Sequence, residues 1–597
     1  MHHRVAADHW GEHRHPNPAR AVTIRRNRAR IAMCRPNVSA AAGSHSQTDR
    51  SVRFGESWFP GRQPFKLRCV GLDKVRSMVD RHLHSGISRR TLLRSTAVGL
   101  VAAPGLVACS SDGPGLVRER PNLTHGVAVG DPRGDGALIW ARSDRPAKLI
   151  VETSATESFT DTRRFEGPAL TPATDGTGRL RLAGLPAGQQ VHYRVTLEGD
   201  GGATSEPLTG VFRTVPTAAS DLRLLWSGDV VGQGWGSNPD LGGMKIFSAM
   251  AARDPHLFIH SGDAIYADGP LKESVTLPDG RVWRNVVTEP KSAVAQTLEQ
   301  FRGQYAYNLL DDNYRRFTGS TAQVVQWDDH ETVNNWYPGG TVAATKGYTE
   351  RSMDVLAQRA WQAFHEWMPL DPAEAVDGRL YRKIPYGPLL DVFMLDMRTY
   401  KDANDANRSP DGKIFGAKQT QWLIDSLRES KATWKIIAND LPLGLVVKDG
   451  EQPNTTAFEG PANSDPGAPS GRETEIARVL SAVKANRVTG VVWLTADVHY
   501  TAAHHYSPER AAFTDFDPFW EFVSGPLNAG AFGPNDLDGT FGPTAVFVNA
   551  PPVQNTSPMD GFQHFGEVLI DGKSRELTVN LCDATGKVLF TQRLPPA

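Results

Sequence analysis

The stretch that decides the fold is Leu257-Phe258-Ile259-His260-Ser261-Gly262-Asp263-Ala264-Ile265-Tyr266. It begins with a short apolar run typical of a buried strand and then turns at a glycine followed by an acid. The same pattern recurs along the chain, with helical segments between the runs. We predict further buried strands at 222–226, 324–327, 389–395, 434–438 and 491–494, and helices at 244–252, 418–430 and 473–484. This alternation predicts α/β or mixed-sheet architecture from about residue 220 onward.

Nearly every predicted strand ends directly at an acid, an amide or a histidine. These residues are Asp229, Asp263, Asp328-Asp329-His330, Asp396, Asn439, and Asp497 with His499. A single acid at a strand end is usually a cap or turn residue. In open α/β sheets, however, ligands bind beyond the carboxyl ends of the strands, so residues far apart in sequence can converge there. We therefore expect these side chains to form one site.

The side chains at these strand ends are of the types that bind hard metal ions. They offer carboxylates, the Tyr266 phenolate and imidazoles, and none offers a thiol. Hard oxygen donors favour Ca²⁺, Mg²⁺, Mn²⁺ or Fe³⁺ over a structural zinc. So many anionic groups in one place would repel one another unless cations lay among them. The sequence therefore predicts a metal centre.

Charge is unevenly distributed along the 597 residues, whose formal net charge is −1. The first 70 residues carry 13 Lys and Arg against 4 Asp and Glu, whereas the rest carry 52 against 62. The acidic body argues against nucleic acid as a structural partner. The 40% hydrophobic content excludes a wholly disordered chain. No run approaches the ~18 apolar residues of a membrane-spanning helix.

Residues 1–77 are rich in Arg, His, Asn and Ser and show no periodic pattern, so we expect a disordered or untranslated leader. A basic arm that binds nucleic acid is the alternative. From Met78 the sequence resembles a fresh start, with Ser88-Arg89-Arg90-Thr91-Leu92-Leu93 followed by an apolar run over 97–108. This predicts a twin-arginine signal peptide at 78–108. A buried amphipathic helix is the alternative there.

The signal ends in Leu106-Val107-Ala108-Cys109, which resembles the cleavage site of a lipoprotein. We therefore expect Cys109 to carry lipid that anchors the protein at the outer face of the membrane, in the periplasm or outside the cell, with a linker over 109–120. Cys582 is then the only cysteine of the body, so no internal disulfide can form. We expect a monomer.

Residues 121–215 are predicted to form a small all-β domain. The sequence around Val191-His192-Tyr193-Arg194-Val195 alternates with the period of a half-buried strand. Leu185-Pro186 followed by Tyr193 resembles the corner of a fibronectin-type sandwich, in which a tyrosine hydroxyl ties back a loop. We expect a structural domain at 121–215 ahead of a catalytic domain at 216–597.

Four motifs together carry a resemblance to a known family. They are Gly262-Asp263-Ala264-Ile265-Tyr266, Trp327-Asp328-Asp329-His330-Glu331, Leu395-Asp396-Met397-Arg398 and Asp497-Val498-His499. Over about residues 121–597 the chain resembles the alkaline phosphatase D (PhoD-like) family of binuclear metallophosphatases, which is related to purple acid phosphatases. The resemblance implies a metallophosphatase-like core of layered β-sheets with helices.

The resemblance also implies roles for individual residues. Asp263 would bridge two metals, one of them Fe³⁺ bound by Tyr266 with Asp229 and His499. Asp329 would hold the second metal with Asp497 and Asn439. Many relatives have a cysteine ligand where this chain has Gly228-Asp229, so Ca²⁺ cannot be assumed as the second ion and Mn²⁺, Zn²⁺ or Mg²⁺ is possible.

In the mechanism expected from this site, a metal-bridging hydroxide attacks phosphorus in a phosphate ester. His330 would protonate the leaving group. Arg398 would neutralise a phosphate oxygen, with a plain pairing to Asp396 as the alternative. Asp328 and Glu331 are expected to cap or support ligands rather than bind metal, and His504 and His505 to lie in a solvated loop.

The sequence thus predicts an exported phosphoesterase, an alkaline phosphatase or phosphodiesterase. One alternative is a phospholipase D-like or cell-wall phosphodiesterase. Another, from a different class, is a surface lipoprotein that binds phosphorylated ligands without catalysis. We interpret the Gly/Pro-rich stretch within 507–565 as a cover over the metal site, and 566–594 as a closing β-hairpin.

Overall fold

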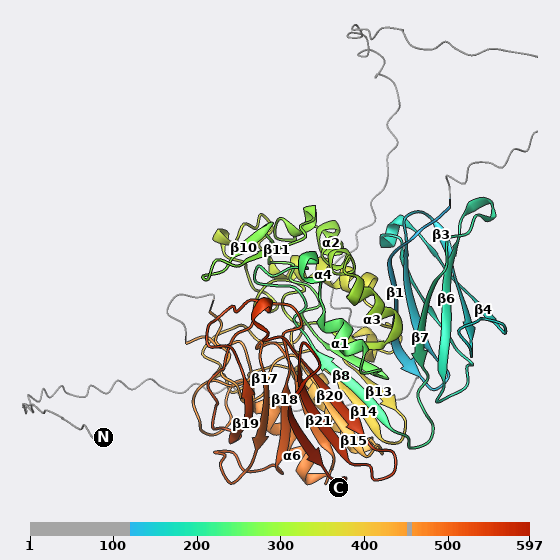
Figure 1. Cartoon of the computed structure of the whole chain (residues 1–597). Helices are drawn as coiled ribbons and strands as arrows, with labels where there is room; N and C mark the ends of the chain where they lie inside the picture. Colours follow the sequence, from blue (N-terminus) through green and yellow to red (C-terminus); the bar gives the residue numbers. More distant parts are fainter. Residues whose placement is uncertain (1–119, 451–455) are drawn as a thin grey trace, which may run out of the picture. The chain divides into compact units, whose positions relative to one another are not determined.

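The structure is a computed structural model that describes residues 120–450 and 456–597. The predicted leader, signal peptide, Cys109 and all but the last residue of the linker lie outside this part of the chain. Within it, no helix combines the length and apolar character needed to cross a membrane. Two large sheets form the core of the described residues. A separate four-stranded sheet is formed by strands within residues 147–213 (Figure 1).

The nine-stranded sheet holds the strand of the opening motif near its centre. In spatial order its strands are β22 (Val588–Leu594), β21 (Leu577–Asp583), β20 (His564–Ile570), β8 (Leu222–Ser227), β9 (Leu257–Ser261), β12 (Ala322–Gln326), β1 (Leu123–Arg133), β2 (Gly136–Ser143) and β5 (Thr177–Arg181). Four adjacent strands of this sheet are parallel to one another, namely β8, β9, β12 and β1. Strands β20 and β21 form the closing hairpin predicted at 566–594, β22 adds a third strand to it, and all three continue the sheet antiparallel.

The seven-stranded sheet supplies the other half of the core. In spatial order its strands are β13 (Arg382–Tyr386), β14 (Leu390–Met394), β15 (Trp434–Ala438), β16 (Val491–Thr495), β18 (Phe519–Val523), β17 (Thr501–Tyr506) and β19 (Pro543–Asn549). Its central strands β14, β15, β16 and β18 are parallel. Most of their residues are buried and apolar, as strands covered on both faces require, and the charged exceptions are Asp391, Lys435 and Glu521.

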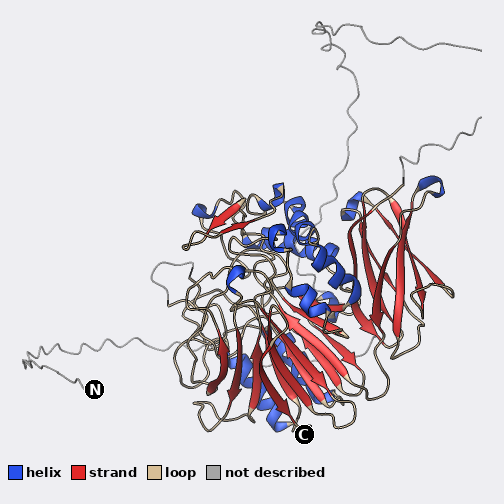
Figure 2. Ribbon diagram, viewed as in Figure 1, coloured by secondary structure: helices blue, strands red, loops and turns tan. Residues whose placement is uncertain are grey.

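The two sheets pack face to face and carry helices on their outer faces (Figure 2). Helices α1 (Ile246–Ala251), α2 (Leu298–Asn308), α3 (Asp312–Ser320) and α4 (Met353–Trp367) share an apolar cluster with the nine-stranded sheet. Helices α5 (Gly416–Glu429) and α6 (Glu473–Ala485) share another with the seven-stranded sheet. This four-layer arrangement confirms the predicted layered core of sheets with helices.

The predicted β-sandwich is present, and it shares the nine-stranded sheet with the part of the chain that follows it. Strands β4 (Arg163–Leu170), β3 (Ala147–Ser154), β6 (Gln190–Glu198) and β7 (Leu208–Arg213) form its second sheet. Its strand β1 pairs with β12, Val129 opposite Ala322. The tyrosine corner was predicted wrongly, because the Tyr193 hydroxyl donates a hydrogen bond to the carbonyl of Gly319 on α3, 2.8 Å away. Tyr193 therefore joins the sandwich to the catalytic part instead of tying back a loop of its own.

Candidate metal centre

The acids that follow the nine-stranded sheet converge at one edge because their strands are adjacent and parallel. Asp229 lies two residues after β8, Asp263 two residues after β9, and Asp329 three residues after β12. The carboxyl ends of these three strands meet at the same edge of the sheet. All three side chains are buried, with 2% exposure or less.

The seven-stranded sheet delivers its polar residues to the same place. Asn439 follows β15 directly, and Asp497 and His499 follow β16. Asp229, Asp263, Asp497 and His499 all have positive φ, between 51° and 66°. A left-handed backbone at a non-glycine residue costs on the order of 1 kcal/mol or more and is typical of functional sites. All four residues therefore lie in strained turns just beyond the ends of their strands.

Three overlapping groups of side chains are each arranged to hold a metal ion, with ligand atoms no more than 4.8 Å apart within a group. The groups are Asp229 with Asp263 and His499, then Asp263 with Asp329 and His330, and finally Asp328 with Asp329 and Asp497. Asp263 belongs to two groups and Asp329 to two. Asp263 therefore lies where a ligand shared by two ions would lie.

On the first side of the site, Tyr266 and His499 lie in direct contact. The Tyr266 hydroxyl is 2.7 Å from Nε2 of His499, and Nε2 is 3.5 Å from the Asp229 carboxylate. The other ring nitrogen of His499, Nδ1, bonds to the carbonyl of Gly530, which fixes the ring and leaves Nε2 toward the site. Burial and the charges of Asp263 and Asp229 raise the pKa of Tyr266, so the phenolate needs a cation to form.

Tyr266 packs so closely against the loop after β8 that only glycine fits there. A Cβ on Gly232 would lie 2.4 Å from the Tyr266 ring. The same ring stacks on the imidazole of His330, with centroids 4.1 Å apart. Gly232 therefore sets the position of the phenol and, through the stack, that of His330.

Of the residues predicted to hold the second metal, Asp329 and Asp497 belong to one ligand group, and Asn439 directly follows β15, the strand next to β16. Asp329 accepts a hydrogen bond from the backbone N–H of Asn335, and Asp497 lies 3.4 Å from Arg398. The Asn439 amide group donates to the carbonyl of Leu441, while its oxygen is buried and has no hydrogen-bond partner among the described residues. An unpaired buried oxygen is costly unless something binds it, and either a water molecule or a cation would satisfy this one.

His330 is held by an acid that we did not predict from the sequence. Its Nδ1 lies 2.7 Å from the carboxylate of Asp268, whose other oxygen accepts a hydrogen bond from the backbone N–H of Asn334. Burial opposes protonation of His330, but the charges of Asp268 and Asp329 outweigh it and raise its pKa to about 10. Asp268 follows no strand directly, so the rule that found the other acids passed over it; its five-residue spacing from Asp263 is the only signal.

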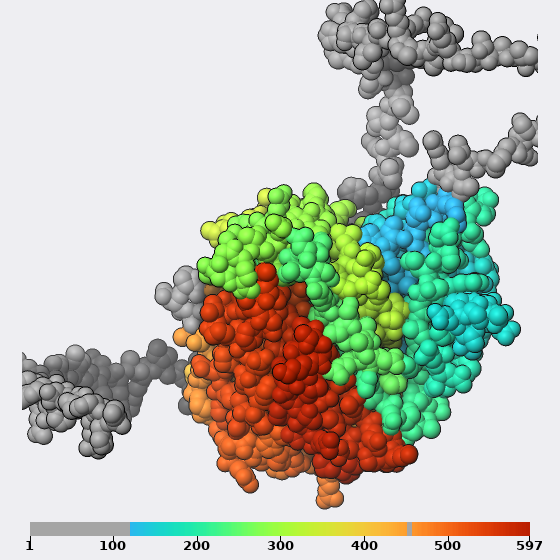
Figure 3. Space-filling model, viewed as in Figure 1, coloured from blue at the N-terminus to red at the C-terminus, as the bar shows by residue number. Residues whose placement is uncertain are grey.

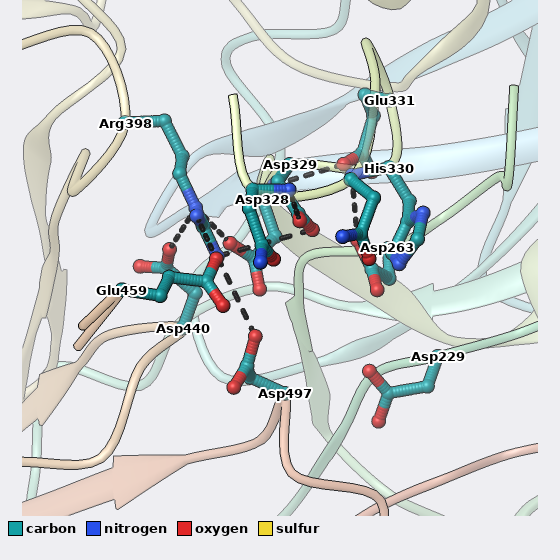
Figure 4. Close-up of polar contacts among 12 residues, drawn as sticks. Asp229, Asp263, Asp328, Asp329, His330, Glu331, Arg398, Asp440, Glu459 and Asp497 are labelled. Atoms are coloured by element: carbon teal, nitrogen blue, oxygen red, sulfur yellow. Dashed lines mark hydrogen bonds and ion pairs between the residues drawn. The ribbon is translucent and has the colours of Figure 1, made fainter. Parts of the chain in front are cut away.

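Arg398 lies among carboxylates (Figure 4). Its guanidinium group contacts Asp328 and Glu459 and lies 3.4 Å from Asp440. The predicted alternative, a side-chain pairing with Asp396, is not formed, because Asp396 accepts hydrogen bonds from Trp327 Nε1, from Thr399 and from the backbone N–H of Arg398.

The supporting role predicted for Glu331 matches its contacts. Its two carboxylate oxygens accept hydrogen bonds from the backbone N–H groups of Ala264 and Asp328, at 2.7 and 2.8 Å. It thereby connects the two loops that carry Asp263 and Asp329. The solvated loop predicted for His504 and His505 was wrong, because both residues lie in strand β17 and His504 is 1% exposed. Two adjacent histidines occur in strands as well as in loops, so the sequence did not decide between the two.

The electrostatics of the site favour bound cations. Burial, and then the charges of neighbouring carboxylates, raise the pKa values of Asp229, Asp263 and Asp497 well above the ordinary range. One oxygen of Asp229 is buried without a hydrogen-bond partner among the described residues. Metal ions would stabilise the charged forms of all three acids and bind this oxygen. The residues present therefore suit a pair of hard metal ions.

The site opens into a cavity of about 450 Å³. Asp263, Asp329, His330, Asp497 and His499 lie on its lining, and Arg398 does not. The segment predicted as a cover contributes one wall, through Phe532 to Asp536 and Gln554. In the space-filling view this late part of the chain, orange to red, lies against the green segment near residues 250–350 (Figure 3).

Comparison with known proteins gives a consistent picture. The family model described as PhoD-like phosphatase matches residues 224–581, and the model of the PhoD-like phosphatase N-terminal domain matches residues 108–216. Alkaline phosphatase D of Bacillus subtilis (strain 168) is 27% identical over 460 residues, which are 72% of this chain and 74% of the relative.

Two solved structures are similar over most of the chain. The structure of PhoD aligns with a TM-score of 0.58 and 20% identity, over 79% of this chain and 92% of its own, and shows a common fold. Purple acid phosphatase PPD1 from yellow lupin (Lupinus luteus) seeds aligns with a TM-score of 0.49 and 12% identity, over 80% of this chain and 74% of its own.

Proposed function

The chain belongs to the PhoD-like phosphatase family of phosphoric ester hydrolases, and from this premise we propose that it is an exported, metal-dependent phosphoesterase. The observation that carries the proposal is the overlap of three ligand groups through Asp263 and Asp329 at the base of an open cavity. Two ions held there would supply the positive charge that polarises a phosphate ester and makes water acidic enough to attack it.

The donor atoms differ between the two sides of the site, and so do the ions that we propose. Tyr266, His499 and Asp229 would hold Fe³⁺ on the first side, since a phenolate and a carboxylate are hard donors. Asp329, Asp497 and Asn439 would hold a divalent ion on the second, Ca²⁺ or Mn²⁺, with Zn²⁺ or Mg²⁺ possible.

His330 is the proposed general acid. Asp268 holds its Nδ1, so Nε2 is the atom that can give a proton to the oxygen of the leaving alcohol. The stack on Tyr266 fixes the plane of the ring. Burial opposes protonation of His330, but the charge of Asp268 raises its pKa, so Asp268 serves both to orient His330 and to favour its charged form.

We propose that the enzyme acts outside the cytoplasmic membrane with lipid on Cys109. The support is the sequence alone, in which twin arginines, an apolar run and the residues before Cys109 occur in order. If this is right, mass spectrometry will show that the mature protein starts with a modified Cys109. The Cys109→Ala variant will no longer be found in the membrane fraction. Membrane association that survives this substitution would rule out the anchor.

Substrates of different classes test the activity. Purified protein loaded with Fe and either Ca²⁺ or Mn²⁺ is offered 4-nitrophenyl phosphate, bis(4-nitrophenyl) phosphate and phosphatidylcholine. We expect hydrolysis of the first or the second. Turnover of phosphatidylcholine alone would point to the phospholipase D-like alternative, and no turnover at any pH would overturn the proposal.

A further inference from the structure

The cavity over the metal centre leaves room for more than the phosphoryl group of an ester. Its volume of about 450 Å³ lies in the range of ~300–1,000 Å³ that is usual for small-molecule sites. The proposed ligands Asp263, Asp329, Asp497 and His499 occupy one part of its lining. The other side chains on the lining therefore meet the alcohol part of the ester and decide which alcohols fit.

Four carboxamide side chains on the lining already have hydrogen bonds inside the protein. They are those of Gln233, Asn335, Asn535 and Gln554, whose partners are Gly530, Asp449, Val446 and Gly533 in that order. These bonds hold the wall of the cavity together. An alcohol that bound through the same amide groups would have to compete with them.

Phe532 gives the cavity an aromatic surface. Among the described residues it carries the only phenyl ring on the lining. The valines there, Val446, Val447 and Val498, are at most 9% exposed, whereas Phe532 is half-buried and can be reached from the cavity. A ring of this kind offers a flat apolar face, which binds other flat apolar groups best.

The backbone fixes Phe532 beside the proposed metal ligand His499. Its N–H donates to the carbonyl of His499 at 3.1 Å, while the carbonyl of Gly530 faces Nδ1 of the same histidine. Ala531, between them, pairs with Thr556 through hydrogen bonds of 2.9 and 3.0 Å. The rings of Phe532 and His499 are nearly perpendicular, with centroids 5.3 Å apart. None of the backbone bonds requires a phenyl side chain at position 532.

A series of ring contacts relates Phe532 to the proposed general acid. Nε2 of His499 lies 2.7 Å from the Tyr266 hydroxyl, and the Tyr266 ring stacks on His330 at 4.1 Å. Phe532, His499 and His330 all lie on the lining of the one cavity. An alcohol whose oxygen receives a proton from Nε2 of His330 therefore has its carbon atoms in the space that Phe532 borders.

We propose that Phe532 is a specificity-determining residue, whose ring packs against the alcohol part of the ester and favours an aromatic or other flat apolar group there. The preferred substrates are then phosphate esters of aromatic alcohols rather than of small alkyl alcohols. The inference rests on the proposed function, because it presupposes that esters are hydrolysed at this site.

Substitutions at Phe532 test the proposal through selectivity. The full, metal-loaded protein is given the phenyl and the ethyl ester of the class that it hydrolyses, monoester or diester, and kcat and KM are measured. The ratio of variant to native for each ester removes the difference in leaving-group acidity. We expect Phe532→Ala to raise KM about tenfold for the phenyl ester, as loss of an aromatic contact predicts, and by less than about twofold for the ethyl ester.

Two further variants and a control sharpen the test. Phe532→Leu should change KM in the same direction if Phe532→Ala does not fold, and Phe532→Trp should keep the native selectivity. Metal content should stay at the native level in all three, because the backbone bonds to His499 remain. Phe165→Leu is the matched control, since Phe165 is a half-buried phenylalanine in strand β4 with Arg163 over its ring. It should affect neither ester.

Several results would overturn the inference while leaving the proposed function intact. They are equal losses on the two esters, an unchanged KM for both, or failure of both Phe532→Ala and Phe532→Leu to fold. Loss of metal from the variants would also overturn it, because the ring would then only support His499. A native protein that hydrolyses neither ester would instead contradict the proposed function itself.

Discussion

Nδ1 of His330 lies 2.7 Å from the carboxylate of Asp268, and the other ring nitrogen, Nε2, is the proposed proton donor. We therefore predict that Asp268→Asn lowers kcat by roughly 10²-fold, because the amide neither orients the imidazole nor stabilises its charge as well. Metal content should stay at the native level. Asp240→Asn, an exposed acid paired with Arg284, is the control and should have no effect.

The pair of His330 and Asp268 also predicts how the rate of hydrolysis depends on the leaving group. His330→Ala should slow hydrolysis of an alkyl phosphate by 10²-fold or more but affect 4-nitrophenyl phosphate less, since nitrophenolate leaves without a proton. Steady-state kinetics on both substrates measure this. Equal losses on the two substrates, or loss of metal from the variant, would mean that His330 is a ligand and not the acid.

Tyr266→Phe tests the iron assignment. The variant keeps the ring that stacks on His330 but lacks the hydroxyl that lies 2.7 Å from His499. We expect the native, iron-loaded protein to absorb visible light through a phenolate-to-iron transition and the variant to lack that band. A native protein that contains only zinc, or a band that persists in Tyr266→Phe, would show that the ligand assignment is wrong.

Gly232→Ala should displace the ring of Tyr266 by steric overlap. The new Cβ would lie 2.4 Å from the Tyr266 ring, so the ring must move. We predict that the visible band shifts or weakens and that turnover falls at least tenfold. Gly134→Ala is the control, because the nearest atom to its Cβ would be the carbonyl oxygen of Val215 at 3.7 Å, an ordinary contact. Identical spectra for the two variants would refute the packing argument.

Several histidines are buried in their neutral form and should therefore destabilise the fold in mild acid. Burial lowers the pKa values of His260, His365 and His564 to about 4. The unfolded chain, with pKa values near 6.5, therefore binds more protons between pH 6.5 and 4. Each histidine contributes stability that is complete above pH 6.5 and is lost toward pH 4, on the order of 3 kcal/mol.

Urea unfolding of metal-stripped native protein and of His564→Gln at pH 7 and pH 5 isolates the histidine contribution, because the raised pKa values of the buried acids Asp229, Asp263 and Asp497 act with the opposite sign and are common to both proteins. In the native protein, Nδ1 of His564 faces the carbonyl of Gly525 and Nε2 faces the amide of Asn549. His564→Gln should be destabilised less than the native protein between pH 7 and pH 5, because glutamine does not titrate. The same change in the free energy of unfolding between pH 7 and pH 5 in both proteins would contradict the prediction.

The sequence was most informative where position on a strand determines position in space. Asp229, Asp263, Asp329, Asn439 and Asp497 were predicted from strand ends, and adjacent parallel strands bring them together. The buried strands themselves were recognisable as short apolar runs. The layered core followed from their alternation with helices, which hydrophobic periodicity reveals locally.

What the sequence did not reveal depends on contacts between distant segments. Asp268 meets His330 only through the fold, and the acids around Arg398 come from loops that no local pattern connects. Helices α2, α3 and α4 were not predicted, and the Tyr193 hydroxyl reaches α3 instead of its own domain. Local periodicity does not encode such pairings, because either partner alone resembles an ordinary surface residue.

The central claim is that two metal ions, sharing Asp263, carry out the hydrolysis. Its most direct test is a metal titration of the stripped protein, with hydrolysis of a phosphate ester followed at each addition. We predict no turnover before metal is added and a rise that levels off at two ions per chain, with no recovery in Asp263→Asn. Full turnover in the stripped protein, or a plateau at one ion, would contradict the claim.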